Sequence, residues 1–269
     1  MSETWLRLLT FAAVFALMAA LELVIPKRRL KALKARRWAT NLTIVGLDSL
    51  LVRGMANLAV PLAAVAAALY AEQQGVGLFN WLAWPAWLEG LLAIAALDFV
   101  LWLQHVAAHK VPLLWRLHQM HHADVDIDVT TAIRFHPAEI ALSILWKIVW
   151  VLGLGAAPLA VLLFEVILSG CAIFNHANIA LPKGLDGVLR ALIVTPDMHR
   201  VHHSISRREH NSNYGFNLSV WDRALGTYTP EPEKGHEGMT IGLAPYQSEA
   251  PTRIGWSLAL PFKPLPKGD

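Results

Sequence analysis

Charged residues are scarce in this chain of 269 residues: Lys, Arg, Asp and Glu make up 16% of it, and 55% is hydrophobic. Soluble domains carry about 25% charged residues. The composition therefore excludes an ordinary soluble protein and favours a chain that lies largely in a bilayer. Cysteine is also scarce, because Cys171 stands alone in an apolar run. That excludes an intrachain disulfide and disfavours a cysteine-based metal site.

Lysine and arginine are absent from Gly54 to His109, whereas seven of the eleven residues from Lys27 to Arg37 are basic. The net charge of +3 is thus concentrated between apolar segments, which argues against binding to nucleic acid. A juxtamembrane cluster facing anionic lipid fits better. The positive-inside rule then places this cluster in the cytoplasm and the N-terminus outside.

Four apolar regions are long enough to supply membrane spans. They run from Leu8 to Ile25, from Leu42 to Ala71 (with a span starting near Arg53), from Trp87 to about Ala108, and from Ala138 to Ile173. The last is too long for one helix, and Gly153, Gly155 and Pro158 predict a helical hairpin within it. Lys147, in the first arm of this hairpin, is expected to extend its amine to the interface.

We therefore predict an all-α integral membrane protein with four to five transmembrane helices. A helical cap on the cytoplasmic side is expected from roughly His176 to Tyr228. The tail from Thr229 holds seven of the fifteen prolines, and we expect it to be largely irregular, because each proline removes a backbone donor.

Histidine is missing from the first hundred residues, and eleven of the twelve histidines fall between His105 and His210. Their spacing is informative. An H-x-x-x-H pair ends the third apolar region, and H-x-x-H-H occurs twice, in the loop that follows and again beginning at His199. Spacings of three and four place imidazoles on one helical face. Many imidazoles together can hold two metal ions such as iron, zinc or copper.

Other metal schemes fit less well. The chain has no H-E-x-x-H motif of a zinc protease. Its one E-x-x-H, Glu233 with His236, lies in the proline-rich tail, whereas a carboxylate-bridged di-iron bundle needs two such motifs. A membrane zinc-dependent hydrolase and a non-catalytic metal binder or transporter remain as alternatives.

The histidine motifs and their surroundings resemble the fatty acid hydroxylase and sterol desaturase superfamily of membrane di-iron enzymes. The matching segments are DFVLWLQHVAAH from Asp98, LWRLHQMHHADVDIDVTTAIRFHP from Leu114, FNHANI from Phe174, and TPDMHRVHHS with NSNYGFNLSVWDRALGTY from Thr195 to Tyr228. The resemblance divides a single membrane domain, residues 1–269, into N-terminal spans (1–90), a histidine-box core (91–228) and a C-terminal tail (229–269).

By this resemblance nine histidines are metal ligands: His105, His109, His118, His121, His122, His176, His199, His202 and His203. His136 and His210 are expected to be outer-sphere partners or further ligands. Asp98, two helical turns deeper than His105, is expensive in lipid and is expected to accept an imidazole N–H. Asn178 is expected to hold a water molecule. Asp197 and Asp222 are further candidates for an outer-sphere or structural role.

The resemblance also implies the chemistry. Two iron ions and molecular oxygen would oxidise a C–H bond of a lipid or sterol-like substrate taken from the bilayer. The residues leave hydroxylation and desaturation open, and we favour hydroxylation. No G-x-G-x-x-G nucleotide motif is present, so an external electron donor is expected, of ferredoxin or cytochrome type with its reductase. The expected location is the plasma membrane of a bacterium or the endoplasmic reticulum of a eukaryote.

Overall fold

The computed structural model describes residues 3–58, 63–82 and 84–264. Within these ranges the chain is helical and its β pairing is limited to isolated bridges, which confirms the all-α prediction. The helices are α1 (Glu3–Val24), α2 (Lys34–Leu58), α3 (Ala64–Gln74), α4 (Ala86–Lys110), α5 (Pro112–His122), α6 (Pro137–Leu154), α7 (Pro158–His176), α8 (Lys183–Arg190), α9 (Pro196–His202), α10 (Arg207–His210), α11 (Val220–Ala224), α12 (Gly235–Gly238) and α13 (Ile254–Ala259). Short 3₁₀ turns are η1 (Leu78–Trp81), η2 (Thr131–Ile133), η3 (Ala244–Tyr246), η4 (Ala250–Thr252) and η5 (Leu260–Phe262).

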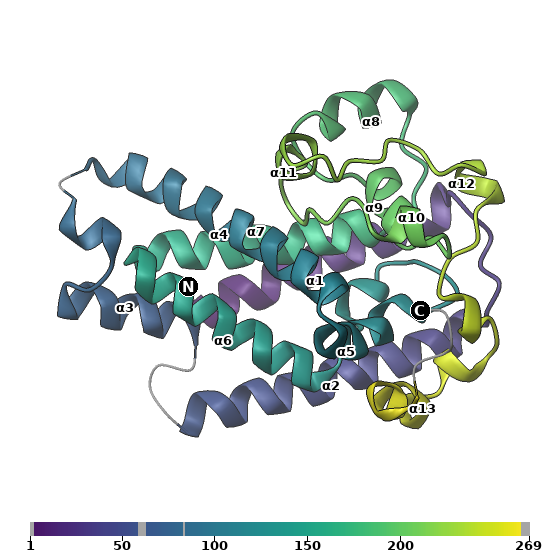
Figure 1. The fold of residues 1–269 in the computed structure, drawn as a ribbon, viewed down its shortest axis with the longest axis horizontal. Coiled ribbons are helices and arrows are strands. Elements are labelled where there is room, and N and C mark those ends of the chain that lie inside the picture. Colours follow the sequence, from purple (N-terminus) through teal and green to yellow (C-terminus); the bar gives the residue numbers. More distant parts are fainter. Residues whose placement is uncertain (1–2, 59–62, 83, 265–269) are drawn as a thin grey trace.

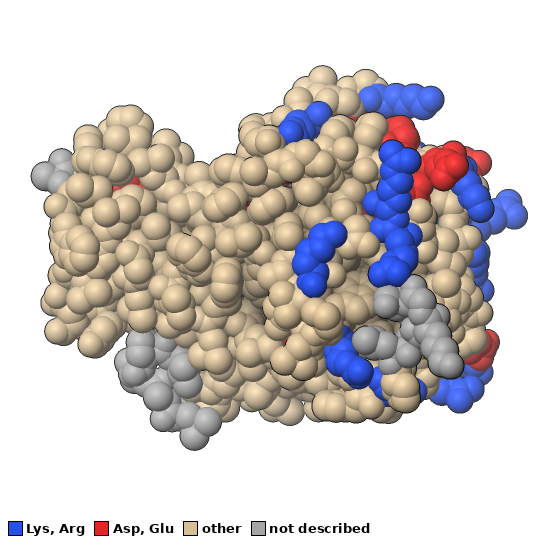
Figure 2. All heavy atoms as spheres, viewed as in Figure 1, with Lys and Arg blue, Asp and Glu red and all other residues tan. Residues whose placement is uncertain are grey.

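Four helices, α1, α4, α6 and α7, are long and apolar enough to cross a membrane. They run along the long axis of the molecule beside α2, and the short helices from α8 onward gather at one end (Figure 1). On the face shown in Figure 2, the charged side chains gather over that same end and the rest of the surface is almost free of charge. Large apolar side chains of the long helices are exposed, such as Leu17 of α1, Leu50 of α2 and Val149 of α6. This is the surface of an integral membrane protein.

The predicted hairpin is confirmed as α6 and α7. Its first helix begins at Pro137, where the ring nitrogen Nδ1 of His136 accepts a hydrogen bond from the amide of Ala138 at 3.1 Å. It ends at Gly155, whose left-handed backbone (φ 65°) suits glycine. The second helix begins at Pro158 and ends at His176. The break thus returns the chain to the capped end of the bundle.

The single span expected from near Arg53 to Ala71 is wrong. Helix α2 continues to Leu58, and the separate helix α3 begins at Ala64, while residues 59–62 of the expected span lie outside the described residues. The backbone of Ala63, directly before α3, is extended (φ −133°, ψ 141°), so the expected span is not one continuous helix. Helix α3 packs against α6 and α7 instead.

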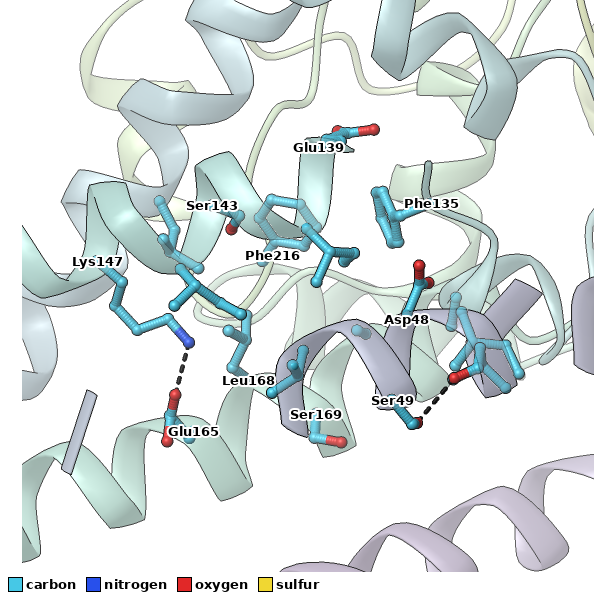
Figure 3. Close-up of a pocket in the computed structure, with 18 of the residues that line it drawn as sticks. Asp48, Ser49, Phe135, Glu139, Ser143, Lys147, Glu165, Leu168, Ser169 and Phe216 are labelled. Carbon is cyan, nitrogen blue, oxygen red and sulfur yellow. Dashed lines mark hydrogen bonds and ion pairs between the residues drawn. The ribbon is translucent and has the colours of Figure 1, made fainter. Parts of the chain in front are cut away.

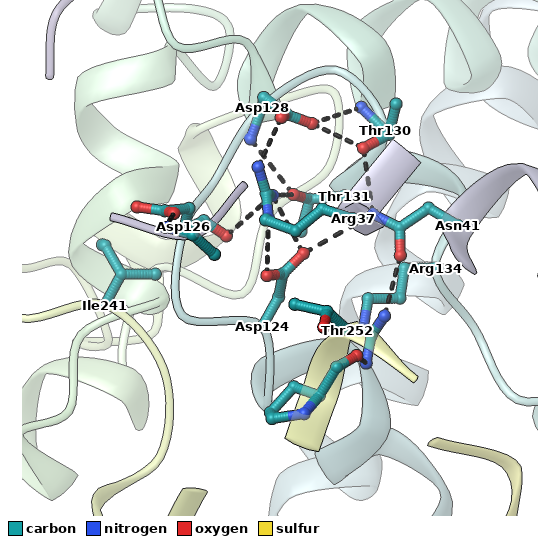
Figure 4. A network of polar contacts seen from close by, with 12 residues as sticks. Arg37, Asn41, Asp124, Asp126, Asp128, Thr130, Thr131, Arg134, Ile241 and Thr252 are labelled. Atoms are coloured by element: carbon teal, nitrogen blue, oxygen red, sulfur yellow. Dashed lines mark hydrogen bonds and ion pairs between the residues drawn. The ribbon is translucent and has the colours of Figure 1, made fainter. Parts of the chain in front are cut away.

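The basic cluster of residues 27–37 does not face lipid as a whole, contrary to the sequence-based interpretation. Lys27 pairs with Asp197 at 2.8 Å. Arg37 is 1% exposed and pairs with Asp124 and Asp128, at 2.7 and 2.5 Å (Figure 4). These acids lie far along the sequence, Asp124 and Asp128 between α5 and α6 and Asp197 in α9, so the pairing could not be read from the cluster itself. The cluster does lie at the histidine-bearing end of the molecule.

The tail from Thr229 is irregular between short helical turns, as predicted, but it is firmly packed. The carbonyl of Pro251 accepts a hydrogen bond from the buried Arg134 at 2.9 Å. Leu260 is fully buried against α5 residues such as Met120. The tail therefore covers the region around α5, while its last five residues lie outside the described chain.

Candidate metal centre

Four helices deliver histidines to one buried region at the capped end of the bundle. Helix α4 supplies two histidines at its end, α5 supplies three, α7 supplies its last residue, and α9 with the residue after it supplies three. They form two groups in which the ring nitrogens lie within 4.8 Å of one another: His105, His109, His118, His122 and His202 in the first, and His121, His176, His199 and His203 in the second. The structure thus brings together all nine histidines that the sequence predicted as ligands. The H-x-x-H-H motif of His118, His121 and His122, which we expected in a loop, lies on helix α5.

Five of these imidazoles are held neutral by their surroundings. Burial, followed by the like charge that neighbouring imidazoles would carry, holds the pKa values of several rings well below their usual range. The rings outside the spanning helices for which this applies are His121, His122, His199, His202 and His203. A neutral imidazole has one bare nitrogen, which is the form that binds a metal ion.

In the first group the proton positions follow from the acceptors. Nδ1 of His105 lies 2.7 Å from the carbonyl of Tyr214, and Nδ1 of His118 lies 2.6 Å from a carboxylate oxygen of Glu139. Both oxygens can only accept, so each Nδ1 carries a proton. The two Nε2 atoms lie 3.1 Å apart, a separation that suits two nitrogens bound to one metal ion.

The second group repeats this arrangement around His176. Its Nδ1 lies 2.7 Å from the carbonyl of Ala172, which leaves Nε2 bare. That Nε2 lies 3.2 Å from Nε2 of His121 and 3.1 Å from Nε2 of His199. Such separations suit nitrogens that share one ion with bonds of about 2.1 Å.

Other ring nitrogens in the two groups are buried without any hydrogen-bond partner among the described residues: both nitrogens of His109, the Nε2 atoms of His122, His202 and His203, and the Nδ1 atoms of His121 and His199. Buried polar atoms are normally paired. The donor set therefore fits two metal ions, one for each group.

Two residues that the sequence analysis missed support these histidines. Glu139, in the first turn of α6, binds Nδ1 of His118, as a carboxylate often does behind a metal-binding imidazole. The ring of Phe135 stacks on His121 at 4.3 Å between centroids. Glu139 stands three residues after the N-cap His136, where an acid is favoured, but the pattern does not indicate which side chain it meets.

A cavity of about 620 Å³ runs from the histidines into the helix bundle (Figure 3). It lies between α1, which packs along α7, and α2, which packs along α6. Much of its wall is apolar, including Leu101, Ile140, Ile144, Leu168 and Phe216. At the end away from the histidines, Glu165 pairs with Arg7 and, at 2.6 Å, with Lys147. Lys147 therefore does not extend to the interface as predicted, because a carboxylate on the other arm of the hairpin binds it.

The sequence of the chain matches the fatty acid hydroxylase family model over residues 90–227. The chain belongs to this family. It is 33% identical over 160 residues to an ornithine lipid hydroxylase of Rhizobium tropici, covering 58% of this chain and 47% of that protein. It is 33% identical over 158 residues to an alkylglycerol monooxygenase of Xenopus tropicalis, covering 58% of this chain and 33% of that protein.

The human alkylglycerol monooxygenase is 32% identical over 170 residues, which cover 61% of this chain and 35% of the human protein. The matched regions thus span less than half the length of each of these relatives. No solved structure matches the chain significantly. The nine clustered histidines all lie within the residues that the fatty acid hydroxylase model matches.

The side chains of Asp98 and Asn178, which we expected to take part in the metal centre, bind other partners. The carboxylate of Asp98 accepts hydrogen bonds from the indole of Trp221 at 2.8 Å and the amide of Leu218 at 3.2 Å. The expected contact with an imidazole is therefore wrong, because a backbone carbonyl takes that place behind His105. The side chain of Asn178 binds the backbone of Arg28, at 3.0 and 2.8 Å, and so ties the linker between α1 and α2 to the cap.

The remaining candidates also lie outside the two histidine groups. His136 caps α6, and its other nitrogen faces the carbonyl of Leu258 at 3.3 Å. The ring of His210 stacks on Trp115 at 5.7 Å. Asp197 binds Lys27 and Arg200, whereas Asp222 accepts from Trp102, Thr227 and two backbone amides.

Proposed function

We propose that this protein is an oxygen-dependent di-iron hydroxylase of a lipid substrate. The observation that carries the proposal is the pair of histidine groups, with ring nitrogens facing one another, at the end of an apolar cavity in a membrane helix bundle. Family membership supports iron as the metal. The printed names of the relatives, a lipid hydroxylase and alkylglycerol monooxygenases, support hydroxylation over desaturation.

The nine clustered histidines would hold the two irons. Bound iron would supply the redox chemistry, by which oxygen, two electrons and two protons convert a C–H bond to C–OH with release of water. The chain's own residues position and enclose this reaction. Glu139 fixes the ring of His118, Phe135 covers His121, and the apolar walls hold a hydrocarbon chain while excluding water.

Partners and location follow from the same arrangement. The electrons would come from a separate ferredoxin or cytochrome with its reductase. The metal centre would face the cytoplasm, because the basic residues 27–37 lie at the same end of the molecule and basic segments are retained on that side. Residues 91–228 would form the catalytic core, with the tail packed over it.

Metal content of the detergent-purified protein tests the proposal, using one substitution in each group, His121→Ala and His202→Ala. We expect about two irons per chain in the wild type and loss of iron in both variants. His136→Asn is the matched control, because this buried histidine lies outside both groups and asparagine also caps helices well. Wild-type protein should then oxidise an alkylglycerol only with oxygen and a reductant. A single zinc, or turnover without oxygen, would contradict the proposal and favour the hydrolase or metal-binder alternatives.

A further inference from the structure

The cavity beside the histidines carries acidic groups at both ends, in different surroundings. At the far end, Glu165 is neutralised by Lys147 and Arg7. At the histidine end, Asp48 of α2 and Glu139 of α6 line the same cavity. Neither forms an ion pair with a lysine or arginine in the described part of the chain, and Glu139 contacts His118 instead.

Both carboxylates at the histidine end have an oxygen without a donor. Asp48 is 6% exposed, and its Oδ1 is buried with no hydrogen-bond partner in the described part of the chain. Glu139 uses Oε1 to bind His118, while its Oε2 is buried and has no partner in that same part. Figure 3 shows Asp48 pointing into the cavity toward Phe135, the ring that stacks on His121.

Two of the hydroxyl groups nearby are committed elsewhere. The hydroxyl of Ser49 donates to the carbonyl of Val45 at 2.7 Å, and that of Ser143 lies 3.4 Å from the side-chain oxygen of Gln104. A buried acceptor without a donor is costly, so these oxygens are suited to a ligand that brings its own donor.

We propose that Asp48 and Glu139 bind a hydrogen-bond-donating polar group, a hydroxyl or an ammonium, of the lipid substrate. This inference rests on the proposed lipid hydroxylase function and narrows its substrate class. A carboxylate or phosphate is disfavoured at this position, because two acids already lie there. The carbons beside the donor group are then the ones brought to the histidines, while the apolar chain extends along the cavity.

Equilibrium binding to the purified holoprotein, without oxygen or reductant, tests this proposal. The probes are four lipids with the same sixteen-carbon chain: hexadecanol, hexadecylamine, hexadecyl methyl ether and hexadecanoate. A charge-assisted hydrogen bond in a buried site corresponds to about tenfold or more in affinity. We expect the alcohol and the amine to bind at least about tenfold more tightly than the methyl ether, and hexadecanoate to bind more weakly than the alcohol.

Substitutions assign the effect to Asp48. Asp48→Asn keeps an acceptor oxygen but removes the charge, so it should retain the preference for the alcohol and lose tight binding of the amine. Asp48→Leu should lose both preferences. Ser49→Ala, on the same cavity wall, is the control and should behave as the wild type. Equal binding of alcohol and ether to the wild type, or unchanged discrimination in Asp48→Leu, would overturn the proposal. Because binding needs no turnover, either outcome is distinguishable from failure of the hydroxylase proposal, which the metal and oxygen measurements decide.

Discussion

Loss of the buried Arg37 side chain should destabilise the protein by a measurable amount. Its guanidinium bridges Asp124 and Asp128, whose side chains are 3% and 0% exposed. Arg37→Met keeps most of the side-chain volume but leaves two buried carboxylates without their cation. Breaking a buried ion pair in this way costs about 3–5 kcal/mol. We therefore expect a decrease of that size in the free energy of unfolding.

Unfolding of the detergent-solubilised protein by urea, followed by tryptophan fluorescence, measures this effect. Arg37→Lys should fall between the wild type and Arg37→Met, because one ammonium cannot bind both acids in the forked geometry of arginine. Arg37→Met combined with Asp124→Asn should recover part of the loss, since one of the unpaired charges is removed.

A neighbouring residue provides the control for this series. Arg36 also forms an ion pair, with Glu249 at 2.7 Å, but both side chains are exposed, 59% and 64%. Exposed pairs contribute little, so Arg36→Met should unfold at nearly the same urea concentration as the wild type. The reasoning would be refuted if Arg37→Met unfolded like Arg36→Met.

Three further predictions concern the metal centre and its support. Glu139→Leu should weaken metal binding about 10–100-fold, with Glu139→Gln in between, because the carboxylate orients His118; titration of the apoprotein with iron measures this. Asp98→Ala should retain the metal stoichiometry of the wild type but lower the free energy of unfolding by about 1–3 kcal/mol, because two donors lose their acceptor; metal analysis and urea unfolding of one sample check both parts. Burial alone would raise the pKa of Asp124, but the adjacent guanidinium holds it below the usual range. Its stabilising contribution should therefore be present above an ordinary aspartate pKa of about 3.9 and be lost as the pH falls below that value, and a urea series at several pH values should show less of this loss in Arg37→Met.

The grouping of the histidines could be predicted from the sequence in part, because the spacing itself carries geometry, whereas the full set of nine, His176 included, followed from the resemblance to the family. Spacings of three and four fix which imidazoles share a helical face, and the hairpin between Gly153 and Pro158 is indicated by residues that end helices. Both features are local, so neighbouring residues suffice to identify them. The length and apolar character of the spans are local in the same way.

The partners of individual acids could not be predicted, because they join distant parts of the chain. The sequence predicts that Asp98 accepts a hydrogen bond from an imidazole near it on the same helix. Its carboxylate instead binds the indole of Trp221, 123 residues later. Arg37 was assigned to a lipid-facing cluster, yet its acids lie some ninety residues later. The role of Glu139 could not be predicted for the same reason, because its partner His118 is on another helix.

The division of the histidines along the chain sets an order for maturation. The first group draws four of its five histidines from residues 105–122 and the last from His202, whereas the second has only His121 in that early stretch. During synthesis, the first group therefore has most of its donors in place long before α9 leaves the ribosome. Neither site can close before α9 is made, so the complete centre can form only after all four apolar spanning helices have been synthesised. In the proposed di-iron centre, metal insertion would then be a late event, and the ions would join the newly made cap to a bundle that already exists.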